Sequence, residues 1–172
     1  MKLYIVGSVA SGKTTLASKL SKQLSIPFYE LDCIVHDGSK CPRYKRTQEE
    51  QAEVIAEINQ ESDWIIEGTY RKSCHMLFEI ADCILFLDPQ LFIRKYRIFK
   101  RFMKQQLGIE KSHYKSDLRM LKLMYKWTRD FENDREDFEE LLGTYHNKLI
   151  IAKSRDEAME RLIFQEREIQ QK

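Results

Sequence analysis

A glycine-rich stretch near the start of the chain constrains its fold more than any other feature. Residues 7–14 read GSVASGKT and fit the pattern G-x-x-x-x-G-K-[ST] of a phosphate-binding loop. The apolar residues 2–6 precede this stretch and leucines four residues apart follow it, which gives the order strand, loop and helix. Backbone N–H groups of such a loop converge on phosphate oxygens at the positive end of the helix. The stretch therefore predicts a site for a nucleotide phosphate.

The residue types in this stretch suit the binding of phosphate. Gly7 and Gly12 permit backbone angles and close approaches that a side chain would block. We expect Lys13 to lie in an exposed loop and to reach the β- and γ-phosphates of ATP, and the Thr14 hydroxyl to bind the accompanying Mg²⁺. The other loop residues expected to contact the nucleotide are Ser8, Ala10, Ser11 and Thr15.

Length and composition narrow the class of protein. Residues 1–172 suffice for a single domain with a central sheet covered by helices. A net charge of +2 gives no overall attraction to nucleic acid, so any basic site must be local. The sequence shows no apolar run of membrane-spanning length and no signal-peptide pattern, and its four cysteines form no close C-x-x-C pair. We therefore expect a cytoplasmic protein with structural thiols; the sequence specifies no oligomeric state.

Short apolar runs alternate with helical patterns along the chain. Strands are predicted at residues 2–6, 26–31, 64–67, 83–87 and 148–152. Capping-box patterns predict that helices begin at Thr47 and Ser154, and residues 33–46 are expected to form a loop. This alternation predicts an α/β fold, the three-layer sandwich of P-loop NTPases, with a five-stranded parallel sheet and helices on both faces.

Two further helical segments, residues 92–103 and 120–131, have apolar stripes that we expect to face the core. Next to each stripe, four cations follow helical spacing. The first set is Arg94, Arg97, Arg101 and Lys104, and the second is Arg119, Lys122, Lys126 and Arg129. For most of these cations we expect a solvated helix face.

Glycines and charged residues stand at the carboxyl ends of the predicted strands. Gly7, Asp32, Glu67–Gly68, Asp88 and Lys153 each stand where a strand ends. Ligands of open parallel sheets bind beyond the carboxyl ends of the strands. The sequence therefore predicts an active site at this edge of the sheet.

Several of these segments together resemble the adenylate-kinase-related P-loop kinases. The resemblance rests on residues 7–14, Leu31-Asp32, residues 64–70 and residues 84–88, and it is closest to the DNA topology modulation proteins. It covers most of the chain and weakens between about residues 104 and 132. It implies ATP-dependent phosphoryl transfer to a small acceptor, with a nucleotide or nucleoside favoured.

The resemblance also implies roles for individual residues. Asp32 would bind or deprotonate the acceptor hydroxyl, although it could instead be a helix or loop cap. Arg71, shortly after Gly68, matches the arginine that grips the acceptor phosphate, and Arg97 and Arg101 match arginines that lead into the lid. Asp32, Gly68 and Arg71 are thus the candidates for acceptor binding. The candidates for catalysis are Lys13, Asp32, Arg97 and Arg101, with Arg129 and Arg135 as further lid cations.

Thr14, Glu67 and Asp88 are the candidate residues for holding Mg²⁺. The DNA topology modulation proteins typically have aspartate where this chain has Glu67, which moves the carboxylate by about one methylene. Glu67 and Asp88 could instead pair with Lys13 or an arginine for structural reasons.

The resemblance divides the chain into an acceptor-binding segment, residues 33–62, and a helical lid, residues 94–135. Two other functions stay open: a P-loop NTPase that hydrolyses its nucleotide, and a nucleic-acid-binding regulator whose basic stripes grip phosphates. The aromatic residues beside those stripes are expected in the core, which counts against stacking on single-stranded nucleic acid.

Overall fold

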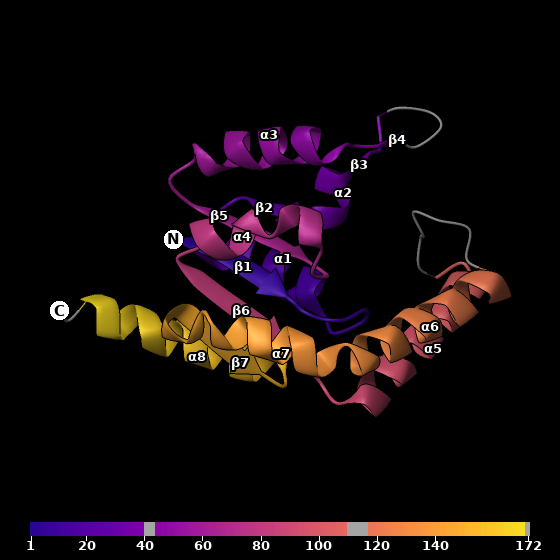
Figure 1. The fold of residues 1–172 in the computed structure, drawn as a ribbon. Coiled ribbons are helices and arrows are strands. Elements are labelled where there is room, and N and C mark those ends of the chain that lie inside the picture. The colour runs from indigo at the N-terminus through magenta and orange to yellow at the C-terminus, as the bar shows by residue number, and fades with distance from the viewer. Residues whose placement is uncertain (40–43, 110–116, 171–172) are drawn as a thin grey trace.

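A computed structural model describes residues 1–39, 44–109 and 117–170 of the chain. Its centre is a five-stranded sheet in which all neighbouring strands are parallel, in the order β2-β5-β1-β6-β7 (Figure 1). The strands are β1 (Lys2–Val6), β2 (Phe28–Glu30), β5 (Trp64–Gly68), β6 (Cys83–Leu87) and β7 (Leu149–Ala152). The predicted sheet is confirmed.

Eight α-helices connect or extend these strands within the described ranges. They are α1 (Lys13–Leu24), α2 (Leu31–Val35), α3 (Gln48–Asn59), α4 (Met76–Ile80), α5 (Leu91–Gln106), α6 (Leu118–Asn133), α7 (Arg135–Gly143) and α8 (Arg155–Gln170). Short 3₁₀ turns η1 (Lys72–Cys74) and η2 (His146–Lys148) and an antiparallel pair, β3 (His36–Asp37) and β4 (Tyr44–Lys45), complete the described elements. None of the helices, as far as the structure describes them, is long and apolar enough to cross a membrane.

Two apolar layers enclose the sheet, because successive residues of a strand point to opposite faces. Leu3 and Ile5 of β1 pack with α1 and α8. Tyr4 and Val6 face the other way and pack with α2, α3, α4 and α7. Helices therefore cover both faces, as the alternation of apolar runs predicts.

Both predicted helix starts are confirmed. The Thr47 side chain accepts a hydrogen bond from the Glu50 N–H, and the Glu50 carboxylate accepts one from the Thr47 N–H. Before α8, the Ser154 hydroxyl accepts a bond of 3.1 Å from the backbone N–H of Glu157. These bonds satisfy N–H groups that the first turn of a helix leaves unpaired.

The prediction of a loop at residues 33–46 is wrong at its start, because residues 31–35 form the short helix α2. Leu31, Ile34 and Val35 are buried, and their spacing places them on one side of a helical turn. Asp32 consequently lies in the first turn of α2 rather than at the tip of a strand. Burial of the three apolar residues decides the conformation here.

The prediction that the apolar stripe of residues 92–103 faces the core is wrong. Its members are Phe92, Tyr96, Phe99 and Met103, and all four are exposed, Phe92 to 67%. Figure 1 shows the reason: α5 and α6 lie side by side and extend away from the sheet. The side of α5 that packs carries Ile98 and Arg94, both 1% exposed. Arg94, expected on a solvated face, is therefore buried.

Two other residues of predicted apolar stripes are also exposed. On α6, Met124 is buried but Trp127 is 44% exposed, and Leu24 at the end of α1 is 37% exposed. Among the cysteines, Cys74 and Cys83 are buried and Cys33 is exposed, while Cys41 lies outside the described residues.

The contact between β5 and α2 gives a first prediction. A Cβ added to Gly68 would lie 2.4 Å from the Leu31 Cβ, so Gly68→Ala must displace α2. We expect a loss of about 1–3 kcal/mol in the free energy of unfolding, measured in urea. The matched control is Gly143→Ala, because a Cβ at Gly143 meets nothing within 4 Å. A Gly68→Ala variant as stable as this control would show that α2 is not held by this contact.

Candidate active site

The phosphate-binding loop emerges from β1 between two neighbouring strands. Val6 pairs with Gly68 of β5 and with Phe86 of β6, so the carboxyl ends of the three strands lie side by side. A Cβ added to Gly7 would lie 2.5 Å from the Leu87 carbonyl oxygen, which only glycine avoids. Gly12, with a φ of 104°, precedes α1, and no side chain caps the helix. The first N–H groups of α1 are thereby left for a ligand.

Lys13 is buried, at 8% exposure, so the expectation of an exposed lysine is wrong. Its ammonium donates hydrogen bonds of 2.8 Å to the Ser8 carbonyl and 3.4 Å to the Ser11 hydroxyl. Burial lowers the pKa of Lys13, and the negative charge of Glu67 opposes that shift. The Ser8 hydroxyl is buried without a hydrogen-bond partner among the described residues. A buried cation beside an unpaired hydroxyl fits a phosphate group, and these residues therefore suit ATP.

Thr14 and Glu67 lie together beside this loop. The Thr14 hydroxyl, on the exposed first turn of α1, donates a bond of 2.7 Å to Glu67, which is 4% exposed. Burial raises the pKa of Glu67, whereas Lys13 and the Thr14 bond lower it. A hydroxyl and a carboxylate beside a phosphate site suit Mg²⁺, which usually takes only one or two protein ligands there. The described residues contain no group of three or more acidic, histidine or cysteine side chains that could hold a metal alone.

Asp32 and Arg71, which the sequence places 39 residues apart, form an ion pair of 2.6 Å. Both side chains are at least a third exposed, Asp32 to 65% and Arg71 to 36%. The pair lies next to Gly68, because Gly68 contacts Leu31 at the start of α2. The structure thus brings the three predicted acceptor residues together.

Asp88 is engaged by Arg135 rather than by a residue of the loop. Its two carboxylate oxygens accept bonds of 2.9 and 3.0 Å from Arg135, and these bonds raise the pKa of Arg135. Arg135 also bonds to Glu132, at 3.1 Å, and Glu132 pairs with the buried Arg94 at 2.5 Å. This network joins the end of β6 to α5, α6 and α7. Of the alternatives for Asp88, pairing with an arginine is the arrangement observed.

Two arginines bracket Gly12. Arg97 donates a bond of 2.6 Å to the Ser11 carbonyl and one of 3.3 Å to the Ala10 carbonyl. A Cβ on Gly12 would lie 3.4 Å from Arg97 Nη1 and 3.5 Å from Arg155 Cδ. Partial burial and then the charge of Arg155 lower the pKa of Arg97. The sequence patterns did not identify Arg155 as a site residue. The signal was its place two residues after Lys153, where the last predicted strand ends at the active-site edge of the sheet.

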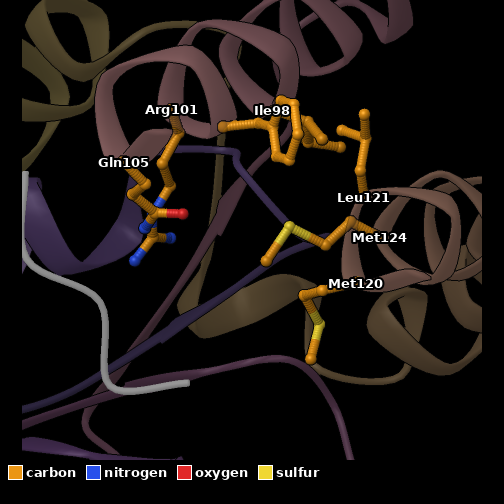
Figure 2. A pocket seen from close by; sticks show the side chains of 7 residues that line it. Ile98, Arg101, Gln105, Met120, Leu121 and Met124 are labelled. Carbon is orange, nitrogen blue, oxygen red and sulfur yellow. The ribbon is translucent and has the colours of Figure 1, made fainter. Parts of the chain in front are cut away.

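Arg101 lies one turn further along α5. It lines a cavity of about 10 Å³ between α5 and α6, together with Ile98, Gln105 and Met124. Figure 2 shows its guanidinium beside the side chain of Gln105, with Met120 and Met124 of α6 nearby. A cavity of this volume has room for about one water molecule, so the cavity itself is not a ligand site. The predicted catalytic role of Arg101 stays a prediction.

A larger pocket lies between α2, the start of α3 and η1, with a volume of about 440 Å³. We call it the acceptor pocket after the predicted acceptor-binding segment that lines most of it. Its lining consists of Val35, Lys45, Arg46, Thr47, Gln48, Gln51, Arg71 and Ser73. Six of these residues, from Val35 to Gln51, fall in the predicted acceptor-binding segment, residues 33–62. Arg71 belongs both to this lining and to the ion pair with Asp32. The pocket therefore lies next to the acceptor residues that the sequence predicts.

Several solved structures of similar fold are kinases. Shikimate kinase from Bacteroides thetaiotaomicron gives a TM-score of 0.57 at 15% identity, over 93% of this chain and 94% of that one. Deoxyadenosine kinase from M. mycoides, solved with dATP, gives 0.54 at 12%, over 96% and 98%. The fold is that of the P-loop kinases. YorR from Bacillus subtilis, solved with phosphorylated GDP, gives 0.57 at 14%, over 99% and 98%.

Sequence similarity to the P-loop kinases is local. No family model matches the chain. A stretch of 32 residues is 50% identical to shikimate kinase of Aquifex aeolicus, and it spans 19% of this chain and 19% of that relative.

The burial of Glu67 gives a prediction on pH. Since its pKa is raised in the folded state, its contribution to stability is complete below the ordinary value of 4.5 and is lost as pH rises through the raised pKa. Glu67→Gln keeps an acceptor for Thr14 and stays uncharged. Its free energy of unfolding relative to the parent should therefore increase as pH rises above 4.5, in urea titrations at several pH values. Glu53→Gln, exposed on α3, is the control. If the difference in free energy of unfolding stays constant or decreases as pH rises, the pKa of Glu67 is not raised in the folded protein.

Proposed function

We propose that this protein catalyses ATP-dependent phosphoryl transfer to a small acceptor that carries a hydroxyl group. One observation carries the proposal: the buried phosphate-binding lysine and the Asp32–Arg71 pair beside the acceptor pocket lie at the same edge of the sheet. A hydrolase needs a phosphate site alone, whereas a transferase needs a second site next to it. The names of the similar structures, shikimate kinase and deoxyadenosine kinase, agree with such a reaction.

Each group at the site has a part in this proposal. The loop N–H groups and Lys13 bind the phosphates of ATP, and Thr14 and Glu67 hold Mg²⁺, which neutralises phosphate charge when bound. Asp32 orients the acceptor hydroxyl and accepts its proton at a carboxylate oxygen. Arg71 holds Asp32 in place and faces the acceptor pocket.

The helical segments complete the proposal. Residues 33–62 bind the acceptor, and residues 94–135 act as a lid over the phosphates, with Arg97 already bonded to the loop. The Asp88–Arg135 ion pair lies at the base of the lid. We therefore assign Asp88 to the positioning of the lid rather than to the binding of Mg²⁺. We place the protein in the cytoplasm. We also propose a kinship with the DNA topology modulation proteins, which the sequence motifs alone support.

The arrangement of cations favours a kinase over a nucleic-acid-binding regulator. A phosphate-gripping stripe needs its cations free on one face. Arg94 is instead buried and paired with Glu132, and Arg97 is turned to the carbonyls of the phosphate-binding loop. The first stripe is thereby interrupted at two of its four positions.

Formation of ADP from ATP and Mg²⁺, with and without small hydroxyl compounds, tests the proposed function. The parent should form ADP faster with an acceptor than without one. Lys13→Met should abolish both turnover and the thermal stabilisation by ATP, about 2.7 kcal/mol at a hundred times the dissociation constant. Asp32→Asn should keep that stabilisation and lose about 10²–10⁴-fold in transfer rate.

The matched control for Asp32→Asn is Asp137→Asn, another exposed carboxylate in the first turn of a helix. It should leave transfer unchanged. ADP formation that no acceptor accelerates would indicate an NTPase instead.

Arg97 gives a second kinetic prediction. Because it touches the loop and stands beside the transferred phosphate in this proposal, Arg97→Met should lower the transfer rate about 10³-fold or more. Lys122→Met, which removes an exposed cation from α6, should be nearly silent. The rate constants come from single-turnover ADP formation. Equal small losses in both variants would argue against a catalytic Arg97.

A further inference from the structure

Helix α5 exposes an apolar stripe along its whole length. Of the eleven large apolar side chains that are exposed in the described part of the chain, six lie between residues 92 and 109. They are Phe92, Tyr96, Phe99, Met103, Leu107 and Ile109. Single exposed apolar residues are ordinary, whereas a contiguous patch marks a surface that meets a partner.

This stripe faces away from the rest of the molecule. Tyr96 stands two residues from both Arg94 and Ile98, which is about 200° around a helix, and those two residues are buried. Phe99 likewise stands two residues from Arg97, whose guanidinium bonds to carbonyls of the phosphate-binding loop. Helix α5 therefore contacts α6 and the loop with one side and presents the stripe on the other, along the projection seen in Figure 1.

Lysines border the stripe on both sides. Helical spacing places Lys95 beside Phe99 along one border, and Lys100 and Lys104 along the other. The Lys100 side chain extends over the ring of Tyr96, with its Nζ 5.8 Å from the ring centroid. All three lysines are exposed, and none of them forms an ion pair with a carboxylate that the structure describes.

Few carboxylates offset this charge. Helix α5 contains six cations and no carboxylate, and α6 contains four cations and two carboxylates, Asp130 and Glu132. Glu132 is engaged by arginines, and Asp117 caps the start of α6. The sequence of residues 110–116, EKSHYKS, adds one carboxylate and two lysines. The whole chain has a net charge of only +2, so the positive excess is local to the two projecting helices.

A second copy of α5 is a poor partner for this stripe. The steps of four, three and four residues from Phe92 to Met103 match the seam of a coiled coil, in which the charges beside the seam decide the pairing. Two α5 helices packed along their stripes would bring Lys95 and Lys100 of each copy against lysines of the other. Like charges at this distance repel, so the borders of the stripe favour an anionic partner.

We propose that the exposed side of α5 attaches the protein to an anionic phospholipid surface. The helix lies in the plane of that surface, and its aromatic and aliphatic side chains enter the boundary between headgroups and acyl chains. Lysine stems lie along the apolar stripe while the ammonium groups reach lipid phosphates and carboxylates. An extended anionic surface meets the lysines of both borders at once, whereas a single partner helix must carry acidic residues along both of its own borders.

Attachment through this side of α5 is compatible with the candidate active site and independent of the reaction that we propose for it. The contact of Arg97 with the loop lies on the opposite side of the helix, so the stripe can be covered while that contact stays in place. Anionic lipids give the cytoplasmic leaflet a negative surface potential, and we place the protein in the cytoplasm.

Sedimentation of the full chain with lipid vesicles tests this proposal. The parent should bind vesicles of phosphatidylcholine with phosphatidylserine but not vesicles of phosphatidylcholine alone, and added salt should weaken the binding. Lys95→Gln, Lys100→Gln and Lys104→Gln should each weaken it about 5-fold, as expected for one cation near an anionic membrane. Phe99→Gln should weaken it about 10-fold or more, because an apolar side chain no longer enters the lipid.

Each kind of variant has a matched control. Ile163 on α8 is 46% exposed and Phe99 is 49% exposed, so Ile163→Gln controls for the loss of an exposed apolar side chain. Lys122→Gln removes an exposed cation from α6 and controls for the lysine variants. Both controls should bind the anionic vesicles nearly as well as the parent. Phe99→Gln should melt at the temperature of the parent, which separates a lost lipid contact from a lost fold.

Four results would overturn the proposal. They are no binding to the anionic vesicles, equal binding to both kinds of vesicle, equal losses in the variants and their controls, and binding that depends on the lysines but not on Phe99. A dimer that forms without lipid and dissociates in Phe99→Gln, measured by light scattering, would instead assign the stripe to a second copy. Tighter binding of single-stranded oligonucleotides than of anionic vesicles would assign it to nucleic acid. ADP formation enters none of these readouts, so the kinase and the lipid surface are tested separately.

Discussion

The parallel pairing of β1 with both β5 and β6 determines where the active site can form. Because Val6 stands between Gly68 and Phe86, the chain that leaves β1 must turn in the space between the ends of its two neighbours. That space is narrow, and Gly7 passes within contact distance of the Leu87 carbonyl. The same pairing places Glu67 next to the first turn of α1, where it meets Thr14. The course of the loop, the Thr14–Glu67 bond and the position of Gly68 beside α2 thus derive from one register.

Paired charges at the carboxyl edge of the sheet shape the site further. Lys13 and Glu67 are both buried, and each shifts the other's pKa toward the charged form while burial favours the neutral forms. Opposite charges that are both buried add little net stability, but the loss of either one leaves the other charge uncompensated. The Asp88–Arg135–Glu132–Arg94 network acts similarly on the helical projection. Rigid attachment of α5 in turn holds Arg97 against the loop.

The sequence predicts the sheet and the phosphate-binding loop well, because both depend on local patterns. Buried parallel strands read as short apolar runs, and the loop requires glycines at fixed spacing. The helical projection is predicted poorly, since an apolar stripe such as Phe92 and Tyr96 has the same spacing whether or not another element covers it. The pairing of Asp88 with Arg135 joins residues 47 positions apart, and no local pattern encodes it. Lys13 is buried because the loop folds around it, which the motif alone does not indicate.

The central place of the first strand has a consequence for biosynthesis. β1 is made first, but its partners β5 and β6 are complete only at Gly68 and Leu87. Roughly 80 residues must follow β1 before both of its edges can pair, which takes roughly 4–16 s at ribosomal speeds of about 5–20 residues per second. During that interval the apolar residues Leu3 to Val6 have no sheet to enter, and the loop that follows has no strand ends to turn between. A nascent chain shorter than this therefore lacks the strand ends that shape the loop, so the proposed phosphate site can form only late in synthesis.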